Sequence, residues 1–153
     1  MKNKYKIYMQ EVDNSGNLKE NTLKDLEDDF DGLRYSKCEG LNTIGAPKNV
    51  YEETYSDANR LRVYLPEEVK NAATTISLTL FFVGDNRYAT KDAFDAYISK
   101  GLHKYWDTCR KKWFIFYVKD EIKPATEELY GSTPFLKYTY TLQNIYGKTF
   151  NVE

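Results

Sequence analysis

The stretch Thr74-Thr-Ile-Ser-Leu-Thr-Leu-Phe-Phe-Val83 decides the fold class of this chain. Every second residue from Ile76 to Phe82 is apolar, and the small polar residues Ser77 and Thr79 alternate with them. A hydrophobic period of two predicts a β-strand with one buried face. The stretch therefore predicts a sheet, and the sequence on either side of it supplies further strands.

Several other segments have strand character. The segment 113–118 is apolar on both faces, which predicts a central strand or a strand between two layers. It follows 102–108 after the bend Arg110-Lys-Lys112, so the two segments are expected to form a hairpin. The remaining predicted strands are 4–12, 60–65 (with Leu61, Val63 and Leu65 facing inward), 135–144 and a short tail strand at 149–152.

One clear helix interrupts these strands. Ala93, Phe94, Tyr97 and Ile98 form a stripe of helical spacing, which predicts a helix over about 91–100 that ends at Gly101. A second, short helix is expected from Thr22 to Phe30. Because strands follow one another without repeated helical crossovers, we predict an α+β, β-dominant fold. Its core is expected to be an antiparallel β-sandwich or barrel of at least six strands with one flanking helix.

The 153 residues are expected to form a single domain. Between residues 32 and 60 the chain contains Gly40, Gly45 and Pro47 and has no clear period, so this part is expected to be a long irregular loop or arm. Residues 124–134 are also expected to be a loop.

Composition and charge limit the classes of partner. Aromatic residues make up 16% of the chain, 14 of them tyrosines, and the net charge is −1. A near-neutral chain lacks the basic footprint of a nucleic-acid binder, and we find no signal peptide or membrane helix. Residues 11–40 carry a net charge of −5 and residues 100–112 a net charge of +4. These segments either favour head-to-tail association or are two solvated faces.

No motif predicts a catalytic or metal site. The only histidine, His103, lies in a predicted strand and is expected to be structural or solvated. Cys38 and Cys109 do not have zinc-site spacing, and Cys109 beside Arg110 is expected to be incidental although nearby positive charge can activate a thiol. Glu27-Asp-Asp-Phe-Asp-Gly32 resembles the start of a calcium loop but has Cys38 at the twelfth position, so an acidic turn is expected. We expect no cofactor and no enzyme activity.

The aromatic residues of 105–117 offer three interpretations. They could form the core, contact a partner subunit, or provide a platform on which sugars or bases stack. A core role with a candidate subunit interface is favoured over a ligand platform. The candidate interface residues are Tyr105, Trp106, Arg110, Lys111, Lys112 and Trp113.

Between about residues 60 and 147, the order of these elements resembles that of tail proteins from long-tailed bacteriophages, particularly the distal-tail and tail-tube group. The segments that carry this resemblance are Arg60–Leu65, Ile76–Val83, the helix Ala93–Ile98, the hairpin Tyr105–Phe116 and the strand Phe135–Asn144.

The resemblance implies a β-sandwich or barrel that assembles into hexameric rings. It implies a non-enzymatic structural component of a tail, tube or baseplate, whose partners are other copies and other tail proteins, with no nucleic acid or membrane. Such a protein would lie in the bacterial host cytoplasm during assembly and then in the virion. Two alternatives stay open: a carbohydrate- or peptide-binding module that uses exposed aromatics, and a small enzyme with a pocket near His103 or residues 25–31.

Overall fold

The computed structural model describes residues 5–53, 62–64 and 66–152. A nine-stranded antiparallel sheet dominates it, so the predicted β-dominant α+β class is confirmed. The strand order is β2 (Lys24–Asp25), β1 (Ile7–Glu11), β7 (His103–Asp107), β8 (Lys112–Val118), β10 (Thr133–Asn144), β6 (Thr74–Val83) and β3 (Leu33–Glu39), with β9 (Thr126–Tyr130) paired to β10 and β11 (Phe150–Asn151) paired to β8.

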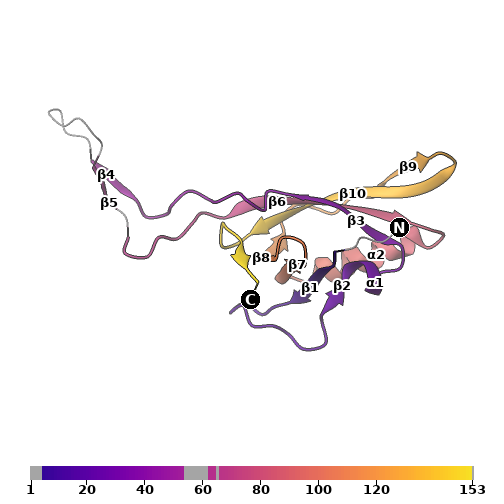
Figure 1. The fold of residues 1–153 in the computed structure, drawn as a ribbon, viewed down its shortest axis with the longest axis horizontal. Coiled ribbons are helices and arrows are strands. Elements are labelled where there is room, and N and C mark those ends of the chain that lie inside the picture. Colours follow the sequence, from indigo (N-terminus) through magenta and orange to yellow (C-terminus); the bar gives the residue numbers. More distant parts are fainter. Residues whose placement is uncertain (1–4, 54–61, 65, 153) are drawn as a thin grey trace.

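Strands β6 and β10 form the spine of the sheet. They pair over ten residues, from Phe135 opposite Val83 to Asn144 opposite Thr74. The predicted strand 74–83 is confirmed at both of its bounds. On its other edge β10 pairs with β9 near its start and with β8 near its end, so it connects the two parts of the sheet. Figure 1 shows β3, β6 and β10 in one layer, with the helices, β1, β7 and β8 on the side below it.

The predicted helix is α2, which spans Arg87–Ile98 and begins a few residues earlier than expected. Phe94, Tyr97 and Ile98 are buried as predicted, but Ala93 is exposed, because the buried face turns toward Thr90 instead. The Thr90 hydroxyl does not cap the helix. It donates a hydrogen bond of 2.6 Å to the backbone oxygen of Asp31 and so ties α2 to the loop before β3.

Aromatic rings fill the space between the layers. A continuous line of nine rings crosses the core, and neighbouring ring centroids lie 4.7–5.8 Å apart. These distances are typical of favourable aromatic pairs. The line explains how a chain poor in aliphatic residues builds a core. In order, it consists of Tyr138, Tyr140, Phe94, Phe30, Tyr97, His103, Phe116, Phe114 and Tyr105.

The buried tyrosines keep their hydroxyl groups hydrogen-bonded. Tyr140 donates to Asp95 Oδ1 at 2.6 Å, and Tyr97 donates to the backbone oxygen of Thr22 at 2.9 Å. Burial raises the pKa of both phenols above the ordinary value, so they act as protonated donors at neutral pH. A hydroxyl buried without such a partner would destabilise the fold.

Lys91 is a charged residue inside this core. Its side chain is 7% exposed, and its ammonium donates to Asp95 Oδ2 at 2.6 Å and to the backbone oxygen of Lys123 at 3.1 Å. The same ammonium lies 4.4 Å from the centroid of the Tyr138 ring. Lys91 therefore connects α2 to the segment 119–125, which links β8 to β9.

Three sequence predictions are wrong in detail. The expected irregular chain over 32–60 includes strand β3, whose bulge between Tyr35 and Lys37 breaks the period of two that would have indicated it. The expected loop 124–134 contains β9, which is exposed along its whole length and so carries no hydrophobic alternation. The expected helix 22–30 is one turn, α1 (Leu26–Asp29), because the residues before it pair with β1 as strand β2.

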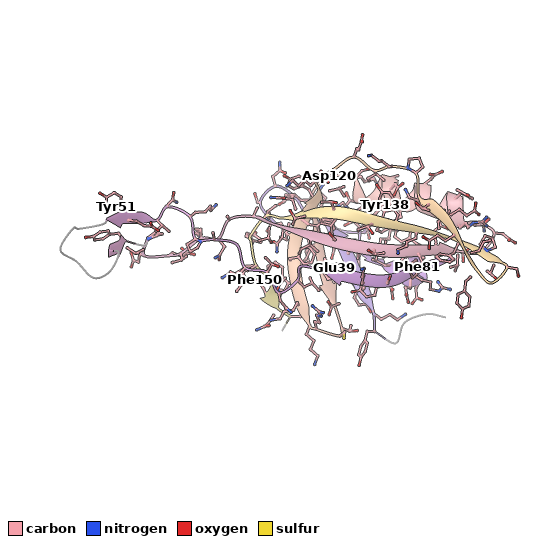
Figure 2. All side chains as sticks on the ribbon, turned by 90° about the horizontal axis from the view of Figure 1, so that it is seen from above. Glu39, Tyr51, Phe81, Asp120, Tyr138 and Phe150 are labelled. Carbon is pink, nitrogen blue, oxygen red and sulfur yellow. The ribbon has the colours of Figure 1, made fainter. Side chains whose placement is uncertain are left out.

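The rest of the segment after Gly40 contributes to an arm. Strands β4 (Tyr51–Glu53) and β5 (Arg62–Tyr64) pair as a two-stranded ribbon that projects from the body, as Figures 1 and 2 show. Val63, which was expected to face inward, is 48% exposed there, because the ribbon has no layer to pack against. The other two expected inward residues, Leu61 and Leu65, lie outside the described residues.

The base of the arm is packed closely against the tail of the chain. The Gly45 amide donates to the backbone oxygen of Gly147 at 2.7 Å. A Cβ atom at either glycine would lie about 2 Å from the Ala72 oxygen, so no other residue fits without a backbone shift. The two segments of the chain that lead into and out of the arm are therefore held in place where they leave the body.

Replacement of Lys91 by alanine is expected to lower the free energy of unfolding by about 3 kcal/mol, because it leaves the Asp95 carboxylate without its buried partner. The matched control is Lys70→Ala, which removes the fully exposed pair with Glu68 and is expected to change stability by less than about 1 kcal/mol. Urea unfolding followed by circular dichroism measures both. Equal effects of the two substitutions would contradict the role of Lys91.

Candidate interaction surface

The hairpin β7–β8 divides the predicted interface residues between two faces. Tyr105 is fully buried and stacks on Phe114 at 4.8 Å, so its assignment to an interface is wrong. The cause is strand alternation, which places Trp106 and Trp113 on the opposite, outer face of the same hairpin.

On that outer face, aromatic residues lie opposite one another across four strands. Tyr8 pairs with Trp106, Trp106 with Trp113, and Trp113 with Phe150. The Tyr8 and Trp106 rings stack at 5.6 Å, and the Trp113 and Phe150 rings stack at 4.6 Å. The Lys104 ammonium lies 5.4 Å and 4.7 Å from the two indole rings. We call these four aromatics the outer row; all four are half-buried.

The contributions of Tyr8 and Phe150 to the outer row were not predicted. Each lies in a segment that the sequence identified as a strand, but cross-strand register decides which residues face one another. The sequence of one strand does not show which residues of the neighbouring strand lie opposite its own.

The turn between β7 and β8 forms a rigid basic tip. The Asp107 carboxylate, 6% exposed, accepts hydrogen bonds from the backbone amides of Arg110 at 2.6 Å and Lys111 at 3.1 Å. It also accepts a longer bond of 3.3 Å from the Tyr105 hydroxyl. Lys111 is held at φ 56°, a left-handed conformation that a side chain adopts only at a cost. The two side chains that extend from this turn, Arg110 and Lys111, are exposed, so they stay candidate interface residues.

Among the described residues, neither the Arg110 guanidinium nor the Lys111 ammonium forms an ion pair with a carboxylate. Lys112, at the start of β8, behaves differently, because its ammonium donates to Asn151 Oδ1. Within this part of the chain, the positive charge of the tip is therefore not neutralised by an ion pair.

The arm carries a second exposed aromatic surface. Tyr51 and Tyr64 lie opposite each other on β4 and β5 with ring centroids 5.7 Å apart, and they are 59% and 48% exposed. Figure 2 shows Tyr51 well away from the body of the protein. Exposed apolar surface of this kind is typical of a contact site.

Much of the acidic segment 11–40 makes internal contacts. Lys6 lies 2.9 Å from Asp28 and 3.6 Å from Asp25. Glu27 is buried, and its carboxylate accepts a hydrogen bond of 3.0 Å from the Tyr35 amide. The resemblance to a calcium loop thus reflects an acidic turn tied to β1 and β3. In the part of the chain that the structure describes, no three His, Cys, Asp or Glu residues are grouped so as to hold a metal ion.

The candidate catalytic residues are separated and mostly enclosed. His103 is fully buried between Tyr97 and Phe116, and its Nδ1 lies 3.1 Å from the Gly101 oxygen. Cys38 is also buried, which raises the pKa of its thiol to about 12, whereas Cys109 is exposed at the basic tip. The core position of His103 supports the structural role expected for it.

No helix among the described residues has both the length and the apolar composition required to cross a membrane.

Comparisons with known proteins give a structural match. No protein-family model and no curated protein matches the sequence. Among solved structures, the chain is similar to a chain of the phage P2 baseplate in its activated conformation with Ca, with a TM-score of 0.54 and 14% sequence identity. The match covers 92% of this chain and 44% of that chain. Nearly the whole chain therefore shares a fold with less than half of a phage baseplate protein.

Replacement of Asp107 by alanine is expected to lower the free energy of unfolding by about 2 kcal/mol, because it leaves two amides of the tip and the buried Tyr105 hydroxyl without an acceptor. The exposed Glu20→Ala substitution is the control and is expected to have less than about 0.5 kcal/mol of effect. Thermal and urea unfolding measure the difference. If Asp107→Ala destabilises the protein no more than Glu20→Ala does, Asp107 does not organise the turn.

His103 makes the fold sensitive to acid. Burial lowers the pKa of its imidazole from the ordinary 6.5, an effect that outweighs the opposing hydrogen bond to Gly101 and the charge of Glu11. The unfolded chain then binds a proton that the folded chain excludes, so His103 contributes stability above pH 6.5 that is lost as the pH falls below that value. The slope is at most about 1.4 kcal/mol per pH unit.

Unfolding free energies of the native protein and His103→Phe, measured from pH 7.5 to 5, test this effect. The native protein is expected to lose more stability than the variant over that range. A variant with the same pH dependence would assign the acid sensitivity to the carboxylates instead.

Proposed function

We propose that this protein is a non-enzymatic structural component of a bacteriophage tail or baseplate, which acts by contacts with other copies of itself and with other tail proteins. The observation that carries the proposal is the fold shared with a phage P2 baseplate protein over 92% of the chain. On this proposal the protein belongs to the distal-tail or tail-tube type and assembles into rings. It would be found in the host cytoplasm during assembly and then in the virion.

The arm supports a role in assembly. It exposes Tyr51, Val63 and Tyr64 on a narrow ribbon whose base is fixed to the body through Gly45 and Gly147. A ribbon that leaves the body with exposed aromatic side chains is suited to cover a neighbouring subunit, where those side chains become buried.

The outer row gives less support to a carbohydrate-binding function. A sugar ring stacks on an open aromatic face. Each indole of the row already stacks on another ring, and the Lys104 ammonium lies over both indoles. The row is therefore better explained as packing that stiffens β1, β7, β8 and β11 beneath a protein contact.

Light scattering coupled to size exclusion, followed by negative-stain microscopy, tests the proposed function on the purified full chain. Oligomers or rings are expected, and the double substitution Tyr51→Ser and Tyr64→Ser is expected to reduce them. Tyr130→Ser, which changes a tyrosine that is 83% exposed on the β9–β10 hairpin, is the control and should leave assembly unchanged.

A strict monomer at high concentration that also binds no phage tail protein would contradict the proposed function.

A further inference from the structure

A groove lies at the end of β8 that is distant from the basic tip. It has a volume of about 560 Å³ and is bordered by the C-terminal turn of α2 and by the segment that follows β8. Its apolar lining includes Ile98, Val118 and Ile122. Among the described residues that line it, Asp95, Asp120 and Glu121 are acidic and none is basic.

Two of these carboxylates are available for a further partner. Asp120 is exposed and has no ion pair among the described residues, and Glu121 has only an exposed contact of 3.5 Å with Lys123. Asp95 is already engaged by Lys91 and Tyr140 and serves as part of the groove wall. The groove thus combines an apolar floor with two exposed carboxylates at its rim, of which only Glu121 has an ion-pair partner among the described residues.

The basic tip has the complementary properties. Arg110 and Lys111 are exposed, their side chains form no ion pair among the described residues, and they extend from a turn that Asp107 fixes. The long aliphatic stems of such side chains bury well against apolar surface while their charged ends meet carboxylates. A fixed turn loses little conformational entropy when it binds.

The tip and the groove of one molecule cannot meet. They lie at opposite ends of β8, a strand of seven residues, and a strand of that length spans roughly 20 Å. Figure 2 shows the same separation, with Asp120 on one side of the body and Phe150, which pairs beside the tip, on the other.

We infer that the basic tip of one copy docks into the acidic groove of a second copy, with Arg110 and Lys111 facing Asp120 and Glu121. This inference rests on the proposed function and deepens it, since it names one contact through which subunits associate. The contact joins two different surfaces, so repeating it from copy to copy builds rings or stacks. On this inference the basic tip binds the groove, and not the acidic segment 11–40 that the charge pattern of the sequence suggested as its partner.

Charge reversal tests the contact. Arg110→Glu with Lys111→Glu, and separately Asp120→Lys with Glu121→Lys, place like charges together and are expected to raise the dissociation constant of self-association at least about tenfold. An equimolar mixture of the two variants should restore association, because the acidic tip of one then meets the basic groove of the other. Lys137→Glu, an exposed reversal on β10, is the control and should associate like the native protein.

Disulfide trapping provides a readout that does not depend on affinity. Cys109 is exposed at the tip, whereas Cys38 is buried, so Ala96→Cys in the groove adds one reactive partner. Mild oxidation is expected to link Cys109 of one copy to the new cysteine of another. Glu128→Cys on β9, an exposed site outside the groove, should link far less.

Native-like association of both charge-reversed variants, or a mixture that fails to restore it, would overturn the inference. So would equal trapping at positions 96 and 128, or a native protein that does not associate together with an Ala96→Cys variant that does not trap. If oligomers persist in the charge-reversed variants, the proposed structural function stands and only this contact is wrong.

Discussion

The line of aromatic rings through the core is the constraint on which the rest of the structure depends. Phe94 of α2 lies against Tyr140 and Phe82 of one layer and against Phe30, and Tyr97 continues the line to His103. One helix therefore joins the β6–β10 layer to the β7–β8 hairpin. Because ring contacts are directional, they fix the orientation of these elements as well as the distance between them. The hydroxyl groups of the buried tyrosines then require acceptors such as the partly buried Asp95, which in turn brings Lys91 into the core.

Strong periodicity made part of this fold predictable. Strand β6, the hairpin β7–β8 and helix α2 each carry an apolar pattern that one layer of the core requires, and all three were expected near their observed positions. Strands β3 and β9 were missed for opposite reasons. The bulge in β3 disrupts its alternation, and β9 has no buried face, so only pairing with β10 defines it. Likewise, alternation could place Tyr105 and Trp106 on opposite faces, but only the curvature of the folded sheet decides which face becomes the core.

The arm and the basic tip share one property. Internal contacts hold each of them in place, and each exposes side chains that could contact a partner. Gly45 and Gly147 fix the base of the arm, and Asp107 fixes the basic tip. Fixed, exposed surfaces of this kind suit the contacts between subunits that we propose for this protein.

Amide hydrogen exchange, compared between dilute and concentrated protein, tests most directly whether the surfaces outside the aromatic core are where subunits meet. Exchange is expected to be slower at the arm strands β4 and β5, at the tip 108–111 and at 119–122 in the concentrated sample. Exchange within β6 should be slow and equal in both samples, because the core is complete in one subunit. Exchange that is unchanged at the arm and the tip, or slowed only within β6, would show that subunits do not meet at these surfaces.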